Sequence, residues 1–203
     1  ISANYRARVG IDSMIFNDQF NGSAVNTTTW SSTLVTFAST VANGFMVLNS
    51  ANITTANAVA RVQTYRGFPA YGSYPLQLEV EAIYASAAQQ PNSVVEIGFG
   101  FATGVATPTD GVFFRYTTTG TFICVVNYNG AETVSAPLTA PEVNVRHHYL
   151  IVVNNNEVEF WIDDILQVAI EVPTGNGMAI INQNTPVLLR IFNAAAPPAA
   201  AVQ

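Results

Sequence analysis

Two pairs of glutamates have the spacing that places both carboxylates on one face of a strand: Glu79 with Glu81, and Glu157 with Glu159. Paired carboxylates are the groups that glycoside hydrolysis uses as nucleophile and general acid. Neither pair is extended by a third carboxylate on the same strand face, because apolar residues follow both. We therefore expect each pair to form the solvent-facing side of a half-buried strand, without a catalytic role.

The candidates for nucleophilic catalysis are Cys124 and the two histidines, His147 and His148. Cys124 lies in the apolar run 122–126, where cysteine behaves as a small hydrophobic residue. Adjacent histidines on a strand face opposite sides and cannot act together. No serine lies in a G-x-S-x-G turn. The sequence predicts that the chain is not an enzyme.

Cofactor and metal sites are not expected. Asp110, Asp163 and Asp164 could supply oxygen ligands to calcium, which needs six to eight of them, but turn formation explains all three. Gly98 and Gly100 are not followed by a helix, so they do not form a phosphate-binding loop. We expect these glycines to permit close packing within a sheet.

Aromatic residues gather in a segment rich in glycine and proline at 65–75. Exposed aromatic rings bind sugar faces, which makes five residues possible carbohydrate-binding positions: Tyr65, Phe68, Tyr71, Tyr74 and Trp161. The alternative, which we favour, is that 65–75 is a crossover packed on the edge of a sandwich. In that interpretation Trp161 covers the outer face of a sheet.

The elements that must position these residues are strands. Apolar residues alternate with polar ones, and turn residues recur every 8–12 positions, a pattern typical of all-β proteins. The predicted strands are 45–49, 58–65, 76–82, 94–101, 112–117, 121–128, 149–153, 157–162, 165–171 and 187–192. The residues expected to point into the core are Leu76, Leu78, Val80, Val158, Phe160 and Ile162.

Turn chemistry indicates antiparallel hairpins. Asn129-Gly130 and Asp163-Asp164 each separate two predicted strands with residues that tolerate positive φ. We therefore expect an antiparallel meander from about 94 to 171. The segment from Tyr84 to Asn92 lacks strand character and is predicted to be a loop.

Composition excludes several classes of function. The chain of 203 residues fits one β domain, and only 10% of its residues are charged. Its seven basic residues are all arginine and its net charge is -6, which argues against nucleic acid or an anionic membrane as partner. No apolar run approaches the roughly 18 residues of a membrane-spanning helix. One cysteine excludes an intrachain disulfide.

Three segments define the domain boundaries. Residues 1–13 form a predicted N-terminal arm, 14–193 a β-sandwich, and 194–203 an Ala/Pro-rich C-terminal segment that cannot supply a central strand. Within the arm, Tyr5, Arg6 and Arg8 are possible interface residues, since tyrosine and arginine are enriched at binding hot spots.

Several segments together resemble the concanavalin A-like jelly roll of lectins, glucanases and laminin-G domains. They are FNDQFNG at 16–22 followed by Trp30, GFMVLN at 44–49, YLIVV at 149–153 and VEFWIDD at 158–164. The resemblance covers 14–193 and implies an antiparallel two-sheet β-sandwich. It also implies that an opening strand at 14–20 lies beside the last strand, so an unpaired edge near residue 193 would need a neighbouring subunit or further chain.

A narrower resemblance is to virion structural proteins of tailed bacteriophages, carried by RVGID at 8–12, PTDGVFFR at 108–115 and FWIDD at 160–164. It implies a capsid decoration or fibre protein on the phage particle surface. The partners would be capsid or tail proteins and further copies of the chain. The alternative is a lectin-like module that binds a host glycan. Glucanases of this architecture carry E-x-D-x-E or E-x-D-x-x-E, a pattern that neither glutamate pair continues, so hydrolysis is not implied.

Overall fold

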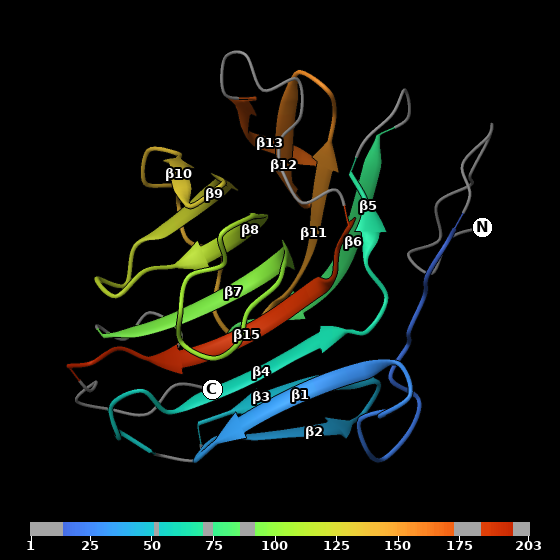
Figure 1. Cartoon of the computed structure of the whole chain (residues 1–203), viewed down its shortest axis with the longest axis vertical. Coiled ribbons are helices and arrows are strands. Elements are labelled where there is room, and N and C mark those ends of the chain that lie inside the picture. The colour runs from blue at the N-terminus through green and yellow to red at the C-terminus, as the bar shows by residue number, and fades with distance from the viewer. Residues whose placement is uncertain (1–13, 51–52, 71–74, 86–91, 173–183, 197–203) are drawn as a thin grey trace.

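The computed structural model describes residues 14–50, 53–70, 75–85, 92–172 and 184–196. Two antiparallel sheets pack face to face as a β-sandwich (Figure 1), which confirms the predicted fold class. The larger sheet has seven strands in the spatial order β1 (Trp30–Val35), β4 (Val59–Thr64), β15 (Val187–Asn193), β7 (Ser93–Gly100), β8 (Gly111–Tyr116), β9 (Phe122–Tyr128) and β10 (Ala131–Val134).

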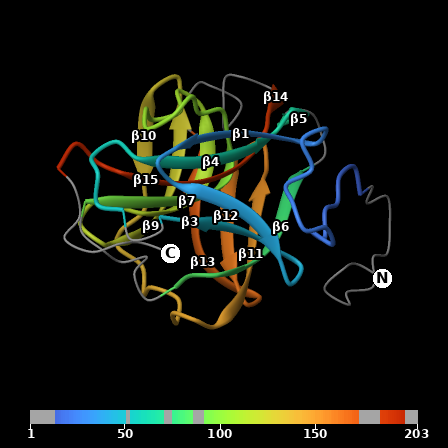
Figure 2. The same ribbon diagram turned by 90° about the horizontal axis from the view of Figure 1, so that it is seen from below.

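The smaller sheet has four strands in the spatial order β13 (Ile165–Glu171), β12 (Glu157–Ile162), β11 (Arg146–Val153) and β6 (Leu76–Ile83). Two further pairs stand apart, β2 (Ala38–Ala42) with β3 (Phe45–Asn49) and β5 (Phe68–Pro69) with β14 (Asn184–Thr185). The view from below shows β11 and β12 running across the larger sheet (Figure 2). None of the described residues forms a helix that could cross a membrane.

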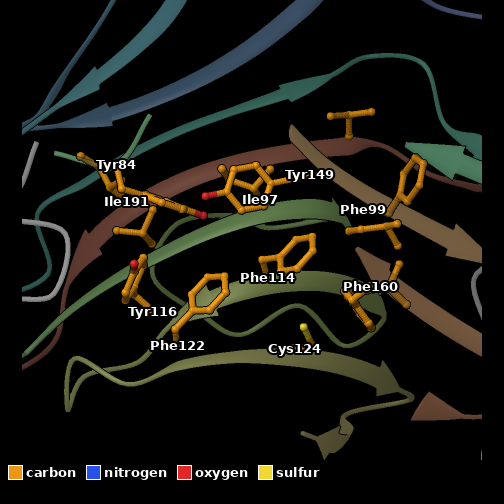
Figure 3. Packing of buried hydrophobic residues seen from close by; sticks show 14 of the residues in the cluster. Tyr84, Ile97, Phe99, Phe114, Tyr116, Phe122, Cys124, Tyr149, Phe160 and Ile191 are labelled. Carbon is orange, nitrogen blue, oxygen red and sulfur yellow. The ribbon is translucent and has the colours of Figure 1, made fainter. Parts of the chain in front are cut away.

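The core lies between the two sheets and is rich in aromatic rings (Figure 3). Phe114 of β8 contacts Phe160 of β12 edge to face at 5.2 Å, so the rings join the sheets directly. The predicted inward residues Val158, Phe160 and Ile162 are buried, and Leu76, Leu78 and Val80 pack partly buried against the same core. A period of two therefore identified the buried face of both strands correctly.

The opening strand predicted at 14–20 is absent, since the described residues 14–29 contain no strand. The segment instead packs through side chains. Phe16 and Phe20 lie against the Trp30 ring at 5.7 and 5.6 Å, and the Trp30 indole N–H donates to Asp18 at 2.7 Å. The apolar residues of this segment cover the end of the core without pairing to a sheet edge.

The expected unpaired edge near residue 193 is also wrong. The last strand, β15, lies inside the larger sheet and pairs with β4 on one side and β7 on the other. Both sets of its backbone donors and acceptors are therefore used. No neighbouring subunit is needed to cover this strand.

The predicted meander from 94 to 171 is divided between two sheets. Strands β7 to β10 follow one another in the larger sheet, after which the chain crosses over and β11 to β13 continue in the smaller sheet. Both predicted turns are confirmed, because Asn129 and Gly130, like Asp163 and Asp164, have positive φ at both central positions. Of the loop predicted from Tyr84 to Asn92, residues 86–91 lie outside the described residues.

Candidate functional site

A row of charged side chains crosses the outward face of the larger sheet, the face away from the aromatic core. Backbone register places Arg61 of β4 opposite Arg190 of β15, Arg190 opposite Glu96 of β7, and Glu96 opposite Arg115 of β8. Arg115 also donates to Glu132 of β10 at 2.8 and 2.9 Å. We call these five side chains the arginine–glutamate row.

Glu96 has both carboxylate oxygens occupied. One accepts from Arg115 at 2.9 Å and the other from Arg190 at 2.8 and 2.5 Å, and both Glu96 and Arg190 are 1% exposed. Burial lowers the pKa of Arg115, but its bonds and charge interactions with Glu132 and Glu96 raise that pKa by more. Both oxygens of this buried carboxylate are therefore engaged by arginines of the neighbouring strands.

Sequence analysis missed Glu96. The available signal is a single charged residue among Val, Ile, Phe and Gly in 93–100. A charge within such an apolar run is seldom buried without a partner. Arg115 lies 19 positions away on the next strand and Arg190 lies 94 positions away on β15, so the ion pairs appear only once the strands are paired.

The strands β7 and β8 approach each other closely at Gly98 and Gly111. A β-carbon on Gly98 would overlap the Val112 carbonyl and the Phe113 backbone, and one on Gly111 would lie 2.6 Å from the Phe99 oxygen. The prediction that Gly98 and Gly100 permit close packing is confirmed at Gly98 but is wrong at Gly100, where an added β-carbon would lie at an ordinary 3.5 Å from its nearest neighbour. No second carboxylate fits two residues after Glu96, where it would share that outward face.

The segment 101–110, between β7 and β8, crosses the outward face of the larger sheet (Figure 1). Its carbonyl groups accept hydrogen bonds from the sheet beneath: Ala102 from Arg61 at 2.8 Å, Gly104 and Ala106 from Arg190 at 2.6 and 2.7 Å, and Pro108 from Asn127 at 2.7 Å. The side chains of the sheet thus hold this loop against the outward face.

A pocket of about 440 Å³ remains open at the end of this face. It lies where β1, β4, the start of the covering loop and the chain before β15 meet, and it is lined by Ser31, Arg61, Gln63, Thr64, Tyr65, Gly67, Phe101, Asn184 and Pro186. Its volume falls within the range of about 300–1,000 Å³ that is usual for small-ligand sites.

Two exposed aromatic rings belong to the pocket. Tyr65 is 66% exposed and Phe101 is 53% exposed, whereas most of the aromatic rings among the described residues are buried. Gln63 is buried and accepts from the Ala102 N–H at 3.2 Å, which leaves its amide nitrogen without a partner among the described residues. The pocket therefore combines apolar ring faces with hydrogen-bonding groups.

The five aromatic positions proposed from sequence do not lie together in the structure. Tyr65 lines the pocket, but Phe68 is 2% exposed and packs against Phe16 and Phe99, so its ring has no face for a sugar. Tyr71 and Tyr74 lie outside the described residues. Phe101 is not one of the five positions proposed from sequence. It is the last residue of the predicted strand 94–101, and its sequence context does not indicate that its ring is exposed.

Trp161 lies on the outward face of the smaller sheet and is half-buried. Its cross-strand neighbours are Leu150 and Leu166, and its indole N–H donates to Glu159 at 2.8 Å. These contacts agree with the interpretation that Trp161 covers the outer face of a sheet. It does not belong to the pocket.

The two glutamate pairs also lie on the smaller sheet. Glu81 forms an exposed ion pair with Arg146 at 3.2 Å, and Glu159 accepts from Asn154 as well as from Trp161. Cys124 is fully buried in the core, and burial raises the pKa of its thiol far above the usual value. None of these groups adjoins the pocket.

His147 and His148 contact the Asp163-Asp164 turn. His147 Nδ1 lies 2.6 Å from an Asp163 oxygen and its Nε2 lies 3.2 Å from the Glu142 carbonyl, while the His148 N–H donates to Asp163 at 2.9 Å. Asp110 accepts from the Asn129 N–H, in a separate turn. Within the described ranges, no group of three or more His, Cys, Asp or Glu could hold a metal ion.

Acid should weaken the fold slightly through Asp163. Partial burial raises the pKa of Asp163, but hydrogen bonds from His147 and the His148 backbone lower it by more, so it lies below the ordinary 3.8. A carboxyl whose pKa is depressed by folding stabilises the protein above the unfolded pKa, and the gain is lost as pH falls through the folded value. We expect the wild type to lose about 0.2–1 kcal/mol more than Asp163→Asn between about pH 5 and about pH 3.

The effect is small because the Asp163 side chain is 48% exposed and solvent screens its charge. Chemical denaturation at a series of pH values measures the difference. Asparagine tolerates the positive φ of this position, so the variant keeps the turn. Equal acid sensitivity of both proteins would show that the His147 contact does not contribute.

No protein-family model matches the chain, and no curated protein matches it in sequence. Solved structures do match over most of its length. A glycosyl hydrolase family protein from Mycobacterium fortuitum is 12% identical with a TM-score of 0.68, covering 94% of this chain and 96% of that one. A structure from work on endo-acting O-glycanases of the human gut microbiota that initiate mucin breakdown is 14% identical with a TM-score of 0.67, covering 89% and 86%.

A further match is the carbohydrate-binding module CBM66 from Bacillus subtilis, which is 12% identical with a TM-score of 0.54 and covers 86% of this chain and 91% of that module. At these identities the likeness shows the fold alone. The chain is an all-β, antiparallel β-sandwich with the concanavalin A-like jelly-roll fold, as the sequence resemblance implied.

Proposed function

We propose that this chain is a carbohydrate-binding module that binds glycans at the pocket beside Tyr65 without hydrolysing them. The observation that carries the proposal is the lining of the pocket, in which the exposed rings of Tyr65 and Phe101 accompany the polar side chains of Gln63 and Asn184. The negative face of an aromatic ring attracts the polarised C–H groups of a sugar. Amide groups bind its hydroxyls.

The non-catalytic half of the proposal rests on the carboxylates. Glu96, on the outward face that carries the pocket, is buried and saturated by two arginines. The Glu79/Glu81 and Glu157/Glu159 pairs lie in the other sheet. The fold is compatible with both outcomes, since the similar structures include glycosyl hydrolases and a carbohydrate-binding module.

Binding to a panel of immobilised glycans tests the proposal, followed by titration calorimetry with the glycans retained. We expect Tyr65→Ala and Phe101→Ala each to weaken binding at least about fivefold, or about 1 kcal/mol, because each removes one ring face. Ile165→Ala, which truncates an exposed residue of β13, should bind as the wild type does. Loss of binding in Trp161→Ala, with Tyr65→Ala unaffected, would place the site on the smaller sheet instead.

The same purified protein should release no reducing sugar from any glycan that it binds. Hydrolysis by the wild type that is abolished in a Glu79→Gln/Glu81→Gln variant would overturn the non-catalytic half of the proposal. The virion role stays a prediction of the sequence resemblance, because its expected interface residues Tyr5, Arg6 and Arg8 lie outside the described residues.

A further inference from the structure

The arginine–glutamate row carries an excess of positive charge. It contains three guanidinium groups, on Arg61, Arg190 and Arg115, and two carboxylates, on Glu96 and Glu132, so the row itself has one more positive than negative charge. The ion pairs of the row all involve Arg190 or Arg115. The unbalanced charge therefore lies at the Arg61 end, where the row reaches the pocket.

The contacts of Arg61 differ from those of the other two arginines. Arg61 is 6% exposed and, within the described ranges, donates only to neutral oxygens: the Ala102 carbonyl at 2.8 Å, the Thr33 hydroxyl at 2.6 Å and the Ser31 hydroxyl at 3.2 Å. Its Nε–H has no acceptor among the described residues. A guanidinium has five N–H groups and three of these bonds are made, so two N–H groups have no acceptor within the part of the chain that the structure describes.

A buried cation without a counter-ion is costly, because desolvation is not offset by a nearby negative charge. Burial lowers the pKa of Arg61 and the charge of Arg190 lowers it further, while Tyr65 acts in the opposite sense. The pocket lining among the described residues includes no Asp or Glu. An anion entering the pocket would thus meet a positive field and no carboxylate.

We infer that the pocket takes an anionic glycan, one whose carboxylate or sulfate group supplies the counter-charge that Arg61 lacks. The inference rests on the proposed function and names the substrate class of the same site. In this arrangement Tyr65 and Phe101 contact the sugar rings, and Arg61 gives the site its preference for glycans that carry a negative charge. A guanidinium group suits this task, since its charge-assisted hydrogen bonds to carboxylate and sulfate-like oxyanions are stronger than those of a neutral donor.

The test compares oligosaccharides of equal length that carry uronate carboxylates, sulfate esters or no charge, by titration calorimetry at low and high salt. We expect at least one anionic series to bind the wild type at least tenfold more tightly than the neutral series. The preference should shrink as salt screens the interaction. Which series binds distinguishes a carboxylate from a sulfate ligand.

Arg61→Gln should reduce affinity for the anionic series at least tenfold and leave affinity for the neutral series within about twofold. Arg146→Gln is the matched control, because it removes an exposed arginine of the smaller sheet and should keep the preference. If Arg61→Gln does not fold, Arg61→Lys, which keeps the charge without the planar donors, replaces it. The lysine variant should retain the salt dependence and lose part of the affinity.

The two levels of the proposal fail in different ways. Equal binding of neutral and anionic series, or a preference that survives in Arg61→Gln, overturns the anionic inference and leaves glycan binding intact. Absence of binding to all three series and to the wider glycan panel overturns the proposed function itself.

Discussion

Replacing Phe160 with alanine is expected to lower the free energy of unfolding by about 3–5 kcal/mol. Phe160 is fully buried and its ring meets Phe114 of the opposite sheet at 5.2 Å and 81°. Removal of the ring leaves a cavity between two sheets, and the hydrogen bonds between their strands hold both backbones in place. The surroundings therefore collapse little, and the lost contacts are not replaced.

Denaturant unfolding followed by tryptophan fluorescence measures the effect. Thr118→Ala provides the control, since Thr118 is exposed in the turn between β8 and β9 and should cost less than about 0.5 kcal/mol. Comparable losses for the two variants would show that the ring of Phe160 does not join the two sheets as described.

Glu96→Gln should cost a similar amount, about 3–5 kcal/mol, although it changes one atom. The substitution removes the charge that Arg190 and Arg115 share, and Arg190 is 1% exposed. Breaking one side of a buried ion pair leaves the other charge desolvated and unpaired. The row would then hold three guanidiniums against the single carboxylate of Glu132.

Glu81→Gln is a matched control for this experiment. It makes the same substitution beside an arginine, but the pair of Glu81 and Arg146 has exposed fractions of 42% and 58%, so at most about 1 kcal/mol is expected. In a double-mutant cycle with Arg190→Met, the losses of unfolding free energy should be strongly non-additive. The reason is that Arg190→Met removes the buried charge that Glu96→Gln leaves unpaired. A loss below about 1 kcal/mol for Glu96→Gln would mean that water reaches the pair.

The local pattern of the sequence determined most of the strands and, for strands with one polar side such as β12, which face is buried. Strands β3, β12 and β13 have the predicted bounds, since alternation with a period of two and positive-φ turn residues act over a few neighbouring positions. The alternation of apolar and polar residues did not indicate β1 and β2, because Ser and Thr stand at positions where an apolar residue would mark a strand. The family resemblance predicted a strand at 14–20. In the structure this segment instead packs through its aromatic side chains.

Strand neighbours and the site were decided only by tertiary structure. The face of a strand follows from its own residues, but its neighbours depend on how two whole sheets close over one core. That closure placed β15 between β4 and β7, which the sequence could not indicate. It also brought Arg61, Tyr65 and Phe101 to one pocket and joined Glu96 to two distant arginines. Such contacts join residues up to about a hundred positions apart, and no local periodicity encodes them.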